Sequence, residues 1–144
     1  MIYEELIENI DKYTNPNQKR FIIEELSQYP YMIIKDEKTF IYRVPEFQNI
    51  NPHYFGLYIR LCNHDISVWI ATEDFNSGFG LGEFDYNIEL TNIIQKSLEN
   101  ANICDFCNTK VGLSNLHRVA FANKSCPNCL ESARKKLEYN GWNN

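Results

Sequence analysis

The side chains of this sequence with the clearest chemistry are its cysteines. Four of the five cysteines form two C-x-x-C pairs, Cys104 with Cys107 and Cys126 with Cys129, and 18 residues separate the pairs. A zinc ion takes four donors in a tetrahedron, and a spacing of two residues lets one turn present both sulfurs. Four thiolates also close the coordination shell and leave no position for a reacting water. The spacing therefore predicts one structural Zn²⁺ held by these four cysteines.

The segments around the two pairs predict how the metal ligands are presented. Residues 108–125 are β-prone with turn formers, and Pro127 begins a helix that ends at Gly141. This order of knuckle, hairpin and helix-opening C-x-x-C resembles a treble-clef zinc finger over about residues 103–139. The resemblance implies that the first pair supplies the knuckle ligands and the second pair the helix ligands. A segment of about 40 residues is too small for a core of its own, so the metal would supply its folding free energy.

Two other chemistries compete with structural zinc in this segment. The sequence Cys126-Pro127-Asn128-Cys129 at a helix start resembles a glutaredoxin-like redox pair, but no βαβ pattern precedes it and a second pair lies nearby. A nuclease of the HNH type also uses a treble clef, but its histidine-rich hairpin is missing. His117 is the one histidine of the segment, and no Asp or Glu lies between Asn108 and Ser125. We therefore expect His117 to be a strand residue with an exposed ring, and the protein not to be an enzyme.

Three further motifs favour ordinary turn or surface roles. The glycine-rich stretch Ser77–Gly82 has acidic residues on both sides, which would repel phosphate, so it predicts a mobile acidic loop or an irregular strand. Cys62, His64 and Asp65 are too close in sequence to meet on one substrate atom, and Cys62 is expected in a strand. The basic stretch Arg134–Lys136 complements the end of the last helix.

The elements that position these residues follow from the hydrophobic pattern. Helical spacing predicts helices over about residues 2–10, 16–29 (Asn15 as cap) and 88–98 (capped near Asp85 or Asn87), and alternation predicts hairpins over 32–44 and 57–70. The expected fold is α+β: an antiparallel four-stranded sheet with helices on one face, followed by a small treble-clef-like zinc module. We place the first domain at residues 1–100 and the zinc-binding module at residues 101–144.

Composition limits the classes of protein that this chain can be. Its 144 residues are 44% apolar and 14% aromatic, which is enough for one core and argues against disorder. The first residues are acidic and no apolar run reaches the length of a membrane span, so we expect a cytoplasmic protein without membrane contact. Residues 1–99 hold 8 Lys and Arg against 16 Asp and Glu, a net charge of −8, whereas residues 100–144 hold 6 against 3, a net charge of +3.

The acidic body favours a binding protein over an enzyme. We expect it to bind a partner protein with a basic surface, as an inhibitor, an immunity-type protein or an adaptor. In charge and size it is similar to bacterial immunity proteins and phage inhibitors, which cover basic nuclease surfaces. The expected partner-binding residues are acidic side chains on either side of the glycine-rich stretch: Glu73, Asp74, Glu83 and Asp85.

Two alternatives stay open at this stage. A nucleic-acid-binding or translation-associated regulator would use the basic residues of the zinc module, which are Arg118, Lys124, Arg134, Lys135 and Lys136. An enzyme would use the acidic glycine-rich stretch on an unknown substrate.

Two aromatic residues are predicted on the second face of the sheet. Tyr58 and Trp69 alternate with the aliphatic residues of their strands, so their side chains lie on the face opposite to the aliphatic ones. That face is either an exposed aromatic patch or a second surface buried under helices.

Overall fold

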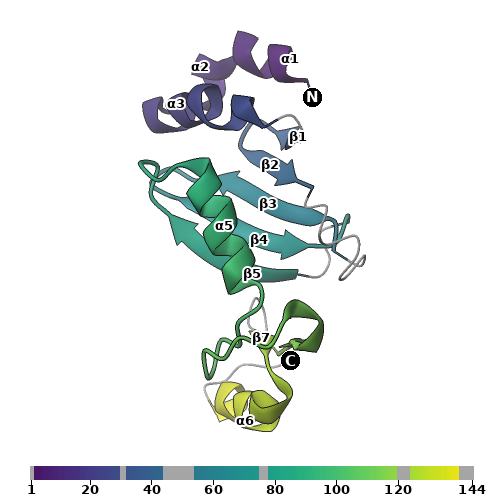
Figure 1. Ribbon diagram of the computed structural model, residues 1–144. Helices are drawn as coiled ribbons and strands as arrows, with labels where there is room; N and C mark the ends of the chain where they lie inside the picture. Colours follow the sequence, from purple (N-terminus) through teal and green to yellow (C-terminus); the bar gives the residue numbers. More distant parts are fainter. Residues whose placement is uncertain (1, 30–31, 44–53, 75–77, 120–123, 140–144) are drawn as a thin grey trace.

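The computed structural model describes residues 2–29, 32–43, 54–74, 78–119 and 124–139 (Figure 1). Short helices come first, then a five-stranded antiparallel sheet, a long helix, and a smaller segment that carries the paired cysteines. The helices are α1 (Tyr3–Glu8), α2 (Ile10–Tyr13), α3 (Pro16–Glu24), η1 (Leu26–Gln28), α5 (Leu90–Asn100), η2 (Leu113–Asn115), η3 (Pro127–Cys129) and α6 (Leu130–Tyr139). The strands are β1 (Met32–Asp36), β2 (Thr39–Tyr42), β3 (Gly56–Leu61), β4 (Ile66–Ala71), β5 (Gly78–Phe84), β6 (His117–Arg118) and β7 (Lys124–Ser125).

The main sheet is a meander in the order β1-β2-β3-β4-β5. The two predicted hairpins are confirmed, with Ile34 opposite Phe40 in the first and Leu61 opposite Ile66 in the second. Val44, the last residue expected in the first hairpin, lies outside the described residues. The α+β class is therefore correct, whereas the predicted number of four strands is wrong.

The strand absent from the predicted four-stranded sheet is β5, which lies in the glycine-rich stretch. Glycine has a low strand propensity and no side chain to alternate, so the alternation pattern did not place this stretch in the sheet. The close pairing with β4 explains the glycine: a Cβ atom on Gly78 would lie 2.2 Å from the carbonyl oxygen of Ile70. The ladder is irregular between Val68 and Trp69, and Gly82 has a φ of 145°. The expectation of an irregular strand is thus met, and that of a loop is not.

The helices cover one face of this sheet. Helix α5 lies across the sheet, and α1 to α3 gather at the end of the molecule opposite the cysteine-bearing segment (Figure 1). The core between helices and sheet joins Leu6 and Phe21 to Ile59 of β3 and Ile93 of α5, each almost fully buried. Each Å² of apolar surface buried between these layers stabilises the fold by about 25 cal/mol.

The opposite face of the sheet carries the aromatic residues that alternation predicted there. Tyr58 lies directly across from Trp69, and a small cluster joins them to Ile41, Phe55 and Ala71. Tyr58 is only 1% exposed, whereas Trp69 is half-buried. Neither of the two possibilities for this face holds as a whole: Tyr58 is buried, so it is not part of an exposed patch, whereas Trp69 is half-buried and Arg60 on the same face is exposed.

Helix boundaries match the sequence signals only in part. Asn15 caps α3 as expected, and its side chain and that of Gln18 form a reciprocal capping box. The first predicted helix is divided into α1 and α2 at Asn9, whose backbone leaves the helical region. Helix α5 begins at Leu90 with Glu89 as its cap, so the caps predicted near residues 85 and 87 are wrong.

Candidate metal centre

The first cysteine pair lies in a tight turn that the backbone closes on both sides. The amide of Asn108 donates to the carbonyl of Cys104 over 3.0 Å, and the amide of Cys104 donates to the carbonyl of Thr109 over 3.0 Å. Asn108 has a φ of 61°, a left-handed conformation that asparagine adopts more readily than most residues. The Sγ of Cys107 lies 3.2 Å from the Oγ1 of Thr109, and hydrogen bonding to Thr109 lowers the pKa of that thiol.

The second cysteine pair opens the last helical segment. Cys126 is the N-cap of η3 and Pro127 is its first residue. The amide of Cys129 donates to the carbonyl of Cys126 over 3.1 Å, which turns both side chains toward the same point. Strand β7 ends one residue before Cys126 and pairs with β6, with His117 opposite Ser125. The predicted end of this helix, Gly141, lies outside the described residues.

The four sulfurs come together from these two turns. One ligand atom from each of Cys104, Cys107, Cys126 and Cys129 lies within 4.8 Å of all the others. The sulfurs of Cys107 and Cys126 are 3.8 Å apart. A tetrahedron with Zn–S bonds of about 2.3 Å requires sulfurs about 3.8 Å apart, so this donor set fits a zinc-sized ion. No disulfide joins these cysteines.

The surroundings of the sulfurs favour a bound cation. Burial raises the pKa of the Cys104 thiol, but the backbone amides of Cys126, Cys107 and Phe106 outweigh that effect and lower it to about 6. Hydrogen bonds with the sulfurs of Cys126 and Cys107, followed by burial, raise the pKa of Cys129 to about 12. Because the negative charge of one thiolate disfavours ionisation of its neighbours, all four thiols lose their protons together only when a cation lies between them.

A buried ion pair supports the metal centre and had no counterpart in the sequence analysis. The ammonium group of Lys124 lies 2.8 Å from Oδ1 of Asp105, and the Lys124 side chain is only 2% exposed. Asp105 lies inside the first cysteine pair, and Lys124 lies two residues before the second. Nothing in a single sequence marks two charges 19 positions apart as partners, so this contact required the structure.

The basic residues proposed to bind nucleic acid are not all available for contacts with phosphate. Lys124 is buried against Asp105, and the ammonium group of Lys135 lies 3.1 Å from Glu131. Arg134 is exposed, whereas the side chains of Arg118 and Lys136 are outside the described part of the structure. His117 lies in β6 and is exposed, as predicted. This arrangement weakens the phosphate-binding interpretation of the segment.

The four acidic residues proposed for partner binding are all exposed but lie in two separate pairs. Glu73 and Asp74 follow the last residue of β4, and Asp74 accepts a hydrogen bond from the hydroxyl of Thr72. Glu83 lies opposite Ser67 near the start of β4, and Asp85 follows the end of β5. The two pairs therefore lie at opposite ends of the β4–β5 ladder.

The residues of the second hairpin turn form an ordinary turn. Cys62 directly follows β3, and its amide donates to the carbonyl of Asp65 over 2.9 Å. Its sulfur lies 3.7 Å from the hydroxyl of Ser67, and His64 is exposed. Within the described residues, no hydrogen bond connects the side chains of Cys62, His64 and Asp65. The turn shows no arrangement for nucleophilic catalysis.

The segment with the cysteines is attached to the body at the end of α5. The backbone carbonyl of Asn102 accepts hydrogen bonds from the amides of Val111 and Gly112, and its side-chain oxygen accepts one from the amide of Leu113. Leu113 is 4% exposed and belongs to the main core. The side chain of Asn100 donates to the carbonyl of Leu81 in β5 over 2.8 Å. These contacts connect the metal centre to the sheet, while the division at residue 100 stays a prediction.

Comparison with known proteins gives no relative for this chain. No family model matches it, and neither the curated proteins nor the solved structures include a significant match. Among the helices in the described ranges, none is long and apolar enough to cross a membrane. Function must therefore be argued from the geometry of the described residues.

Proposed function

We propose that the four cysteines bind one structural Zn²⁺ and that residues 101–144 form a treble-clef-like module around it. The sulfur cluster, with Cys107 and Cys126 3.8 Å apart, is the observation that supports the metal. The order of turn, β6–β7 hairpin and helix α6 supports the treble-clef comparison. When bound, the ion cross-links two segments that have only small apolar clusters of their own. The chain's own contribution is the hydrogen bonding that orients the sulfurs.

We propose further that the protein is not an enzyme and acts in the cytoplasm by binding a partner protein with a basic surface. The observation that carries this proposal is the exposure of Glu73, Asp74, Glu83 and Asp85 at the two ends of the β4–β5 ladder, in a body with a strong negative charge. A partner that contacts both pairs would cover the edge strand β5. Charge complementarity of this kind mainly raises the association rate and the specificity. An inhibitor or immunity-type protein that covers a basic enzyme surface matches this pattern.

The test compares two variants with the same change in net charge. One neutralises Glu73, Asp74, Glu83 and Asp85 as Gln or Asn, and the control neutralises four exposed acidic residues of α1 and α2: Glu4, Glu5, Glu8 and Asp11. The partner is captured from the native host by cross-linking, identified by mass spectrometry and purified. We expect the first variant to slow association by about tenfold or more at low salt and the control to have little effect. Equal effects of the two variants, or no captured protein, would contradict the proposal.

The nucleic-acid alternative is not adopted, because the burial of Lys124 removes one of its five basic residues. A salt titration still discriminates the two functions directly. Several phosphate contacts would make the affinity for RNA or DNA fall steeply with salt concentration. We expect no such binding by the zinc-loaded protein at physiological ionic strength.

A further inference from the structure

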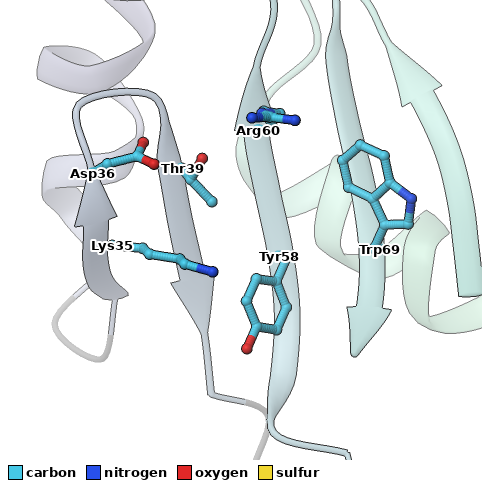
Figure 2. Close-up of a pocket in the computed structure, with 6 residues that line it drawn as sticks. All are labelled: Lys35, Asp36, Thr39, Tyr58, Arg60 and Trp69. Carbon is cyan, nitrogen blue, oxygen red and sulfur yellow. The ribbon is translucent and has the colours of Figure 1, made fainter. Parts of the chain in front are cut away.

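The sheet face opposite α5 contains a cavity of about 290 Å³ that the metal centre and the acidic pairs do not use. Strands β1 to β4 supply its walls. Figure 2 shows six of the side chains that line it, which are Lys35, Asp36, Thr39, Tyr58, Arg60 and Trp69. We call this feature the sheet-face cavity.

The aromatic part of the sheet-face cavity is held in place by hydrogen bonds and register. The hydroxyl of Tyr58 donates to the carbonyl of Thr72 over 2.8 Å, and the ammonium group of Lys35 lies 5.4 Å from the Tyr58 ring centroid. In Figure 2 the end of Lys35 points toward that ring. Trp69 lies directly across from Tyr58 and remains half-buried. The cavity therefore has a fixed aromatic wall with part of the indole still accessible.

Among the described lining residues of the cavity, cations outnumber carboxylates although the body is acidic. Lys35 and Arg60 contribute two positive charges, and Asp36 contributes one negative charge. One oxygen of Asp36 already accepts the amide of Lys38 over 2.9 Å. Arg60 is exposed, and its guanidinium has no hydrogen bond or ion pair with any residue in the described ranges. A guanidinium in this position is suited to a phosphate or carboxylate group, which it binds through two parallel hydrogen bonds.

The register sets the distance between the aromatic and the cationic groups. Arg60 pairs with Ser67 while Tyr58 pairs with Trp69, so Arg60 and Trp69 are diagonal neighbours, about 7–8 Å apart at the backbone. The cavity volume is at the lower end of small-molecule sites, which start at about 300 Å³. We propose that the sheet-face cavity binds a small ligand in which a planar aromatic ring carries an anionic group. The ring stacks on Trp69, and Arg60 with Lys35 binds the anion.

The experiment observes Trp69 directly in the zinc-loaded full-length protein. Trp142→Phe leaves Trp69 as the sole tryptophan, so its indole N–H gives a single signal in a ¹⁵N-correlation NMR spectrum. The probes are AMP, which joins a ring to a phosphate, and 2-naphthoate, which joins a ring to a carboxylate. Adenosine and inorganic phosphate supply each half alone. We expect a saturable shift with AMP, 2-naphthoate or both, and a response at least about tenfold weaker to either half alone.

Two variants distinguish this site from unspecific binding. Arg60→Gln, at an exposed position, should weaken the binding of the better probe by about tenfold or more without changing the thermal midpoint. Lys96→Gln on α5, which covers the other face of the sheet, should leave it unchanged. No saturable shift with either probe would overturn the proposal, as would equal effects of the two variants. A short oligoadenylate that binds far more tightly than AMP would also overturn it, in favour of a nucleic-acid surface.

Discussion

Asp105 and Lys124 bind each other through three hydrogen bonds that join the two halves of the metal centre. The carboxylate of Asp105 accepts both the backbone amide and the ammonium group of Lys124, each over 2.8 Å. In return, the amide of Asp105 donates to the carbonyl of Lys124 over 3.0 Å. Asp105 lies inside the first cysteine pair, and Lys124 lies two residues before the second pair. The ion pair therefore fixes the distance between the two cysteine turns. Outer contacts of this kind orient metal ligands and influence metal affinity.

The first prediction concerns the asymmetry of this pair. Asp105→Asn leaves the buried ammonium group of Lys124 without a counter-charge, which should cost about 3 kcal/mol, the lower end for a buried pair. The cost is at this lower end because the Asp105 side chain keeps a third of its surface exposed, whereas the Lys124 side chain is 2% exposed. Lys124→Met removes the charge that needs a partner and leaves the Asp105 carboxylate in contact with water, so it should cost less. Chemical unfolding of the zinc-loaded variants measures both.

Zinc affinity provides a second measurement on the same variants. Competition with a chromophoric chelator should show about 10- to 100-fold weaker zinc binding for Asp105→Asn, the range expected of contacts just outside the ligands. The double variant Asp105→Asn with Lys124→Met should recover part of that loss. If Lys124→Met proves the more damaging single change, the ion pair does not act as we describe.

The second prediction is the metal content of cysteine variants. The purified protein should contain one zinc per chain, because the four sulfurs fill one tetrahedral shell. Cys126→Ser removes a ligand and should abolish stoichiometric binding, and helix α6 should lose its order. Cys62→Ser is the matched control, since Cys62 lies after β3 and outside the sulfur cluster. Metal analysis by mass spectrometry and circular dichroism measure the two effects.

Metal removal should act on the C-terminal segment and spare the sheet. The main core is formed by the helices and strands of the body, to which the cysteine-bearing segment contributes Leu113. Chelation should therefore lower the helical signal of α6 while most of the sheet signal remains. Loss of all secondary structure on chelation, or zinc-free protein with an intact α6, would contradict this prediction.

The sequence predicted the metal ligands well because their chemistry depends on local spacing. Two C-x-x-C pairs need only two short turns that face each other, and the structure brings all four sulfurs together. The cap at Asn15 and the alternation of Tyr58 and Trp69 were also predictable, because each depends on neighbouring residues. These features share a physical cause that acts over a few residues.

The missed features depend on contacts between distant residues. Strand β5 forms because its backbone pairs with β4, although its glycines have little strand propensity. Lys124 looks like a surface cation in the sequence and is buried only because Asp105 lies beside it. The sheet-face cavity likewise depends on register, which places Arg60 diagonal to Trp69. Spacing along the chain carries no information about such pairings.

The third prediction tests the helix cap at Asn15. Its side chain accepts the amide of Gln18 over 2.9 Å and donates to the carbonyl of Asn63 over 3.1 Å. Asn15→Ala removes both hydrogen bonds and should cost about 1 kcal/mol, the usual value for an N-cap. Asn17→Ala, an exposed substitution inside the same helix, should be neutral or slightly stabilising. Thermal unfolding of both variants tests the difference, and equal midpoints would exclude a capping role.

The fourth prediction is a loss of stability at alkaline pH that depends on Tyr86. Burial is the largest cause that raises the pKa of Tyr86 to about 12, and the nearby Cys62 and Asp65 add to it, against a smaller opposite effect of Gln18. The Tyr86 hydroxyl donates to the carbonyl of Cys62, and a phenolate cannot donate. Since the folded pKa is above the unfolded value of about 10, this contribution is complete below pH 10 and is lost as pH rises toward 12.

Tyr86→Phe should therefore change the shape of the stability curve as well as its height. Near pH 8 the variant should be less stable by about 1 kcal/mol, because one hydrogen bond is lost while Gln18 still donates to the Cys62 carbonyl. From pH 10 to 12 the wild type should lose about 2 to 3 kcal/mol that the variant does not lose, so the two curves converge and cross. Tyr13→Phe, at a 41% exposed position, is the control and should follow the wild type. Urea unfolding across this pH range measures the curves, and parallel curves for wild type and Tyr86→Phe would show that Tyr86 ionises as freely in the folded as in the unfolded protein.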